Sequence, residues 1–162
     1  MSSRQTKTKT KTKTQKTNQQ TIEKKKQKPK QVQQQRSRRK KRTTIVSVKK
    51  KYLVQRRINS FLEWKQLPNT VYIGRNMSFY VEGATKSKWA NPFTVKKYGR
   101  VNCLKKYEEY VRNSEELYNS LPELIGKELG CWCKPDTCHG DILIDLVKEY
   151  QYKQKQKQQN EN

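Results

Sequence analysis

The spacing of apolar residues predicts short strands and helices between about residues 43 and 150. β-Branched residues are frequent in TTIVSV (43–48) and NTVYIGR (69–75), which indicates two strands. The compact apolar run ELGCWC (128–133) indicates a third strand. The second run ends in Gly74-Arg75, and the third is followed by the turn segment KPDT (134–137).

Segments in which apolar residues have helical spacing lie between the second and third strands and after the third. Residues 104–111 place apolar or aromatic side chains on one helix face, namely Leu104, Tyr107, Tyr110 and Val111. Ser114 is a typical N-cap for a second helix, which Gly126 ends. The segment GDILIDLVKEY (140–150) predicts a last amphipathic helix. This order predicts a small single α/β domain with a short, partly parallel sheet flanked by helices.

Charge divides the 162-residue chain, which has a formal net charge of +24, into three parts. Residues 1–50 contain nineteen Lys or Arg and one acidic residue, whereas residues 69–150 contain twelve and eleven. The segment 1–42 has too few apolar residues to offset its conformational entropy, so a disordered basic tail is predicted there. A second, short disordered tail is predicted at 151–162. The folded domain is therefore expected to span 43–150.

The basic tail predicts a partner. Lys and Arg at this density neutralise phosphates, so residues 1–42 are expected to bind nucleic acid electrostatically and without sequence preference. The run RSRRKKR (36–42) also matches a nuclear-localisation patch. The alternative is a solvated tail that maintains solubility. No apolar run is long enough to span a membrane and no signal peptide is evident, so an intracellular, soluble protein with reduced thiols and no membrane partner is expected.

The segment CWCKPDTCHGD (131–141) contains three of the four cysteines and the only histidine. It lies at a predicted strand–turn–helix junction, where α/β folds bind ligands beyond the carboxyl ends of strands. Near a helix N-terminus Cys138 would be an activated nucleophile, and His139 would act as acid or base. Asp141 would orient His139, hold a substrate hydroxyl or act as a base, and Gly140 would allow a ligand to approach the backbone. The predicted catalytic set is therefore His139, Asp141 and Cys138, although the sequence leaves open whether the domain is an enzyme.

Two alternatives apply to the same segment. In the first, Asp136 or Thr137 caps the helix, Asp141 complements its dipole and the cysteines are buried packing residues. In the second, zinc is bound by four residues with the spacing C-x-C-x4-C-H, namely Cys131, Cys133, Cys138 and His139. Zinc sites more often contain C-x2-C pairs, but Cys131 and Cys133 would face the same side of a strand.

Two further motifs predict ligand-binding residues. Arg75 follows the YIGR strand and offers a planar fork to phosphate. In SKWANPF (87–93), Lys88 would bind an anionic group, while Trp89 and Asn91 would contact a ring. With Gly140, these residues predict a site for a nucleotide or another phosphorylated metabolite. The alternative for Arg75 is an ion pair on the surface, and the alternative for SKWANPF is a loop held by buried aromatic residues. For the whole chain, the alternatives to a ligand-binding domain are a non-enzymatic nucleic-acid-associated protein and a zinc-stapled interaction module.

Four sequence blocks together resemble the domain-of-unknown-function family DUF4326. In chain order they are VYIGR (71–75), SKWANPF (87–93), the region from YGR to YVR (98–112), and LPELIGKELGCWCKPDTCHGDIL (121–143). The resemblance covers about residues 43–149 and implies a compact α/β domain, but no particular reaction. Ala90 stands where the family usually has Gly. The added Lys-rich tail indicates a member of the kind found in large DNA viruses, which would act in the host cytoplasm, the nucleus or the virion.

Overall fold

The computed structural model describes residues 42–160. The predicted basic tail and its RSRRKKR segment, apart from Arg42, lie outside these residues. In chain order the elements are β1 (Thr44–Ser47), α2 (Lys50–Gln55), α3 (Phe61–Gln66), β2 (Thr70–Tyr72), α4 (Val95–Asn113), α5 (Glu115–Ser120), the 3-10 helix η1 (Leu121–Leu124), β3 (Glu128–Cys131) and α6 (His139–Asn160). The predicted small α/β class is confirmed.

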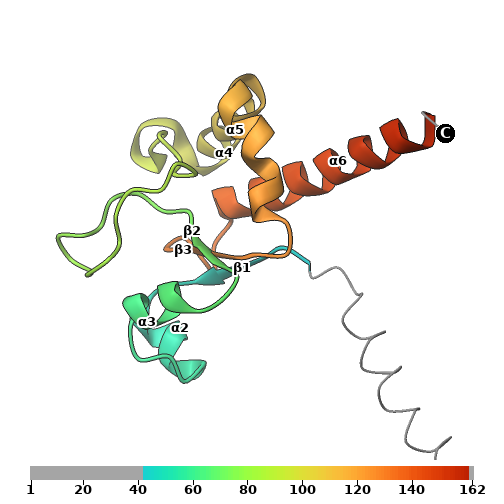
Figure 1. The fold of residues 1–162 in the computed structure, drawn as a ribbon. Coiled ribbons are helices and arrows are strands. Elements are labelled where there is room, and N and C mark those ends of the chain that lie inside the picture. Colours follow the sequence, from blue (N-terminus) through green and yellow to red (C-terminus); the bar gives the residue numbers. More distant parts are fainter. Residues whose placement is uncertain (1–41, 161–162) are drawn as a thin grey trace, which may run out of the picture. The chain divides into compact units, whose positions relative to one another are not determined.

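The three strands form one parallel sheet in the order β1-β3-β2, so the last strand in the chain lies at its centre. Ile45 and Val71, on the two outer strands, are both aligned with Leu129 of β3. Helices α4, α5 and α6 lie on one side of the sheet and α2 and α3 on the other (Figure 1). Because all three strands are parallel, their carboxyl ends meet at a single edge of the sheet.

Two apolar clusters cover the two sides of the sheet. The larger one joins the sheet to α4, α5 and α6, and its largest fully buried side chains include Tyr107, Leu121, Leu124, Leu129, Leu143 and Leu146. The smaller one joins β1 and β2 to α2 and α3 and contains Val48, Leu53, Ile58, Phe61, Trp64, Tyr72 and Ala84. β3 contributes Leu129 to the first cluster, whereas the absence of a side chain at Gly130 leaves room for the ring of Trp64.

A polar contact fixes the first residue of β3 beside α3. The carboxylate of Glu128 accepts a 2.8 Å hydrogen bond from Trp64 Nε1 and two from the guanidinium of Arg56, at 2.9 and 2.8 Å. Burial alone would raise the pKa of Glu128, but the bonds from Arg56 and Trp64 outweigh it and hold the pKa below its usual value. The indole of Trp64 is therefore held by both its ring contacts and its N–H group.

Two helices differ in length from the sequence prediction. α4 already begins at Val95 and is kinked at Gly99, whose φ of 71° is accessible to glycine without strain. α6 continues to Asn160, through most of the segment predicted as a disordered tail. Its first turn beyond residue 150 is supported by Lys153, which pairs with Glu149 at 2.8 Å and bonds the hydroxyl of Tyr118.

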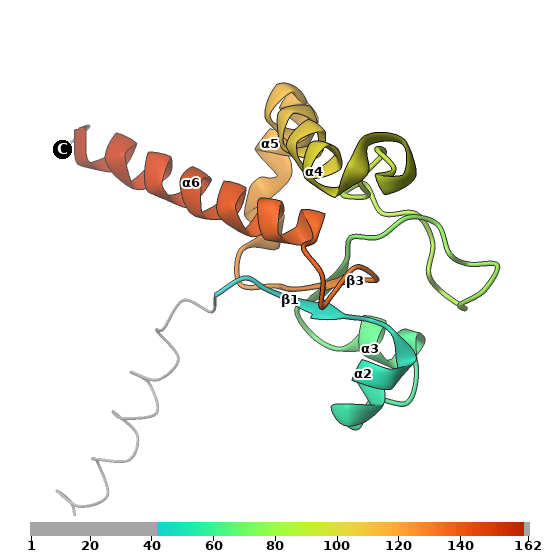
Figure 2. The same cartoon turned by 180° about the vertical axis from the view of Figure 1, so that it is seen from behind.

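The last turns of α6 extend beyond α4 and α5 (Figure 2). Within residues 42–160, no helix combines the length and the apolar character that crossing a membrane requires.

Candidate metal centre

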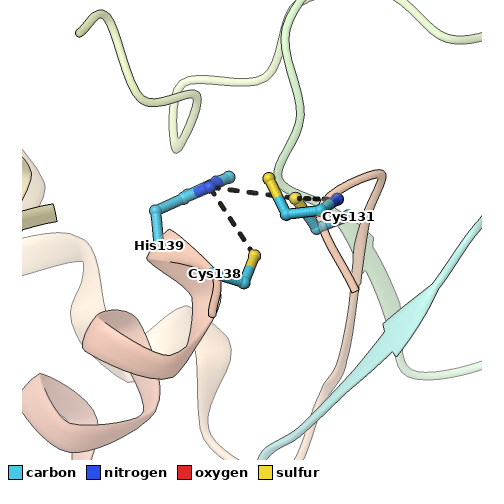
Figure 3. A group of neighbouring side chains, drawn as sticks. Cys131, Cys138 and His139 are labelled. Atoms are coloured by element: carbon cyan, nitrogen blue, oxygen red, sulfur yellow. Dashed lines mark hydrogen bonds between the residues drawn. The ribbon is translucent and has the colours of Figure 1, made fainter. Parts of the chain in front are cut away.

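The connection from β3 to α6 brings three cysteines and the histidine together at the carboxyl edge of the sheet. Cys131 ends β3, Cys133 lies in the turn, and Cys138 and His139 stand at the start of α6. The ligand atoms of all four residues lie within 4.8 Å of one another. Figure 3 shows the sulfur atoms of Cys131 and Cys138 facing the imidazole of His139. The four side chains thus enclose a single point.

The imidazole of His139 is held in one orientation. Its Nε2 lies 2.8 Å from the carbonyl oxygen of Ile73, just beyond β2. A carbonyl oxygen only accepts, so Nε2 carries a proton, and Nδ1 faces the cysteine sulfur atoms, where it can bind a metal once it has lost its own proton. Nδ1 lies 3.8 Å from the sulfur atoms of both Cys131 and Cys138. Tetrahedral zinc bonds of about 2.3 Å to sulfur and 2.0–2.1 Å to nitrogen would separate such atoms by about 3.6 Å, so the observed spacing suits this metal.

Backbone N–H groups stabilise negative charge on the sulfur atoms. The N–H of Cys133 donates to the sulfur of Cys131 at 3.5 Å, and the N–H of Gly140 donates to the sulfur of Cys138 at 3.4 Å. Cys131, Cys138 and His139 are 1%, 0% and 5% exposed, while Cys133 is only partly buried. The cluster is therefore nearly closed to solvent and reached from the side of Cys133.

The close packing of these groups shifts their proton affinities. Burial disfavours a charged His139, but hydrogen bonds to Cys131 and Cys133 outweigh it and raise the pKa of the imidazole to about 10. Hydrogen bonds from Cys131, Cys138 and His139 lower the pKa of Cys133. The pKa of Cys138 is raised, because its hydrogen bonds with Cys131 and Cys133 and its burial both favour the neutral thiol. These pKa shifts favour an imidazolium at His139 beside a thiolate at Cys133.

The predicted catalytic residues have separate surroundings. Cys138 and His139 belong to the cluster, but the carboxylate of Asp141 accepts a 3.0 Å bond from the N–H of Cys138 and pairs with Lys134 at 2.7 Å. These contacts are those of a helix cap. At Gly140 a Cβ atom would lie 1.9 Å from Cδ1 of Ile45, so the apolar core already occupies the space next to this glycine.

The predicted ligand-binding residues divide in the same way. Arg75 donates through Nε to the carbonyl oxygen of Asn91 at 2.9 Å and through Nη2 to that of Phe93. Asn91 is buried and bonds the sulfur of Cys103 at 3.3 Å. Lys88 pairs with Glu123 at 2.7 Å on the surface, and Trp89 is 2% exposed. Of these residues, Arg75 and Asn91 face a common pocket; Lys88 and Trp89 lie outside its lining.

This pocket has a volume of about 620 Å³ and lies beside the cysteine–histidine cluster. Its walls come from the residues that follow all three strands and from the first turns of α4. Three of its basic residues, Lys49, Lys96 and Arg100, were not singled out from the sequence. Lys49 stands just beyond β1, so the strand-end rule that selected Arg75 would have found it. Lys96 and Arg100 carry no comparable sequence signal, because only the tertiary fold brings α4 to this edge.

Comparison with known proteins identifies relatives of the domain. Residues 54–149 match the family described as "Domain of unknown function (DUF4326)". A protein named "Uncharacterized protein R718", from Acanthamoeba polyphaga mimivirus, is 40% identical over 87 residues, which cover 48% of this chain and 66% of the viral one. The match therefore spans slightly less than two thirds of that relative. No solved structure matches the chain.

Proposed function

This chain belongs to the DUF4326 family, and we propose that it is a zinc-binding domain whose metal is held by Cys131, Cys133, Cys138 and His139. The observation that supports this proposal is the convergence of four ligand atoms within 4.8 Å. Four protein ligands complete a tetrahedral shell, which is the arrangement of structural zinc sites. The metal would join the end of β3 to the start of α6.

The second contact of His139 extends this connection to a third element. Its Nε2–H group donates to the carbonyl oxygen of Ile73 after β2. Metal-ligating histidines commonly use their other ring nitrogen in this way, which fixes the ring orientation and the tautomer. Zinc would thus lock the carboxyl edge of the sheet and form one rigid wall of the neighbouring pocket.

The contacts of the predicted catalytic residues favour a metal site over nucleophilic catalysis. Cys138 is fully buried, and its sulfur faces His139 and accepts from the N–H of Gly140. A catalytic thiolate is ordinarily partly accessible to its substrate. Asp141 caps the helix, whereas a triad would require it to orient the imidazole. His139 is oriented by Ile73 instead.

Metal analysis of the purified full-length chain tests this proposal. We expect one zinc per chain by native mass spectrometry and by elemental analysis. Cys133→Ser should reduce the zinc content at least about tenfold, because loss of one thiolate leaves an incomplete shell. Cys133 is the most accessible of the three thiols, so this substitution disturbs the core least.

Cys103→Ser is the matched control. Cys103 is buried, and its sulfur contacts Asn91 and the carbonyl oxygen of Phe93 at 3.3 Å, contacts that a hydroxyl group can also make. This variant should retain one zinc. Wild-type protein that contains no zinc after purification without chelator and remains metal-free in added zinc would reject the proposal, as would equal zinc content in both variants.

A small-molecule site in the adjoining pocket is a second proposal. The pocket is formed beyond the carboxyl ends of three parallel strands, where open α/β sheets bind their ligands. The predicted phosphorylated ligand would bind there, with Arg75 and Asn91 in the wall. Its chemistry is argued from the charges of the pocket in the next subsection.

The basic tail supports a third, independent proposal, namely non-specific binding of nucleic acid through residues 1–42. This segment contains seventeen Lys or Arg and one acidic residue. Anisotropy of labelled single- and double-stranded oligonucleotides should show affinity that falls about a thousandfold or more between about 50 and 200 mM salt. A chain that lacks residues 1–41 should lose this steep dependence. If its affinity and salt dependence match those of the full chain, the tail is not the binding segment.

A further inference from the structure

We propose that the pocket at the carboxyl edge of the sheet binds a phosphate monoester attached to a planar ring, of the nucleoside monophosphate class, and that Lys49 and Lys96 bind the phosphate. This inference rests on the proposed small-molecule site and specifies its ligand. It also replaces Lys88, which pairs with Glu123 outside the pocket lining, as the predicted anion-binding residue.

The charges in the pocket lining are strongly unequal. Four basic side chains line it, namely Lys49, Arg75, Lys96 and Arg100, against one carboxylate, that of Asp136. Arg100 lies 3.7 Å from Asp136 and donates to the carbonyl oxygen of Thr137, so these two groups largely satisfy each other. A bound zinc with three thiolates would add one negative charge, which leaves the lining with a net positive charge.

Within residues 42–160, Lys49 and Lys96 are the basic side chains of the pocket that bond no other group, whereas Arg75 and Arg100 donate to backbone carbonyl oxygens. In the part of the chain that the structure describes, neither ammonium group forms an ion pair. They reach the pocket from different elements, Lys49 from the β1–α2 connection and Lys96 from the first turn of α4. Two ammonium groups facing one concave space repel each other, and a dianionic group between them would remove this repulsion.

Arg75 has a different role. Its guanidinium connects the end of β2 to the backbone at residues 91 and 93. These bonds occupy donors that a phosphate would otherwise use. Arg75 therefore contributes positive charge to the pocket and positions its wall, whereas the lysines remain free to contact a ligand.

The remaining wall of the pocket is apolar, which indicates that the ligand carries an apolar or aromatic group beside its phosphate. Met77, Val95, Leu104 and Trp132 supply an apolar lining. The ring of Trp132 is fixed, because its Nε1 donates to the hydroxyl of Tyr72 at 2.6 Å and the ring stacks on Phe61 at an interplanar angle of 27°. A rigid aromatic wall of this kind is a good contact for a planar ring.

The size of the pocket favours a ligand larger than inorganic phosphate. The pocket volume of about 620 Å³ lies within the range of about 300–1,000 Å³ that is typical of small-molecule sites. A phosphate group alone would reach the lysines but leave the apolar wall in contact with water. A ring linked to a phosphate would use both surfaces at once.

Isothermal titration of the full-length chain with AMP tests this inference. Adenosine and inorganic phosphate serve as the two partial ligands, in about 150 mM salt so that contacts with the basic tail are screened. We expect saturable binding of AMP with an affinity at least about tenfold higher than that of either partial ligand, because each lacks one of the two contact surfaces. Adenosine binding equal to AMP binding, or the absence of saturable AMP binding, would overturn the inference.

A pair of double variants locates the phosphate contact. Lys49→Ala/Lys96→Ala should weaken AMP binding at least about tenfold, because charge-assisted bonds to the phosphate are lost. Lys49 makes no side-chain cap bond to α2, and Lys96 is exposed, so this variant should fold normally. Lys50→Ala/Lys105→Ala is the matched control, since it removes two exposed lysines outside the pocket lining, one next to Lys49 and one from α4, the helix of Lys96. Equal weakening by both double variants would show general electrostatic attraction and reject the assignment.

The zinc content of the same samples separates this inference from the metal site. Both double variants should retain one zinc per chain. If zinc is present and AMP does not bind, the ligand assignment fails and the metal site stands. If AMP binds in the expected pattern to a chain without zinc, the metal proposal fails and the pocket assignment stands.

Discussion

In buffer with zinc, the Cys138→Ser variant is expected to unfold about 10–20 °C below the wild-type chain. A metal present at about a thousand times its Kd stabilises the folded state by about 4 kcal/mol, and a domain of this size loses a few degrees per kcal/mol. Cys138 is 0% exposed at the start of α6, where its replacement removes one of four ligands. Circular dichroism or differential scanning fluorimetry measures the effect.

A chelator distinguishes loss of the metal from an effect of the serine itself. Chelator-treated wild type should unfold close to the temperature of Cys138→Ser, and the variant should not respond to chelator. The Cys103→Ser control should respond to chelator as the wild type does. A wild-type melting temperature that is unaffected by a strong chelator would show that the cysteines and His139 are ordinary packing residues.

The second large effect is expected from Gly130→Ala, which should destabilise the domain by about 3 kcal/mol. An alanine Cβ at this position would lie 2.1 Å from Cη2 of Trp64 and 2.6 Å from two further ring atoms. The indole cannot easily move away, because it is fully buried and its Nε1 bonds Glu128. Denaturant titration of the free energy of unfolding measures this change.

A double-mutant cycle shows whether the ring is the cause. Trp64→Phe removes the part of the indole that the new methyl group would contact, although it loses packing and the bond to Glu128 on its own. The double variant should therefore lose less free energy of unfolding than the two single variants lose in sum, by about 1 kcal/mol or more. Additive free energies would place the cost of Gly130→Ala elsewhere.

The three strands could be located from the sequence because each is a short run rich in β-branched or apolar residues. The expected strand segments 43–48, 69–75 and 128–133 contain β1, β2 and β3 in turn. The central place of β3 was not predicted, because it depends on pairing between segments more than fifty residues apart. The end of α6 was missed because residues 151–160 are almost entirely polar, while the fold supports their first turn through the contact of Lys153 with Tyr118.

The place of the candidate site was accessible from the sequence, but the roles of its residues were not. Clustering of Cys and His in a strand–turn–helix segment indicated the carboxyl edge. The C-x-C-x4-C-H spacing differs from the C-x2-C pairs of most zinc sites, yet the ligand atoms converge, with Cys138 just before the helix and His139 as its first residue. Catalysis by His139, Asp141 and Cys138 stays a prediction. The strand-end rule could have selected Lys49, which follows β1, whereas Lys96 reaches the pocket only because α4 lies at the sheet edge, which no local pattern contains.

The strand order also affects how the protein is made. β1 and β2 each pair with β3 on opposite sides, so neither can join a sheet until residues 128–131 have been synthesised. The first two strands must leave the ribosome without partners, and parallel pairing at this sequence separation is slow to form. The four proposed metal ligands, by contrast, lie within nine consecutive residues, a short loop that closes at little entropic cost. A nascent chain could therefore bind its metal as soon as this segment is synthesised. The metal-linked β3–α6 segment would then be the template on which β1 and β2 pair.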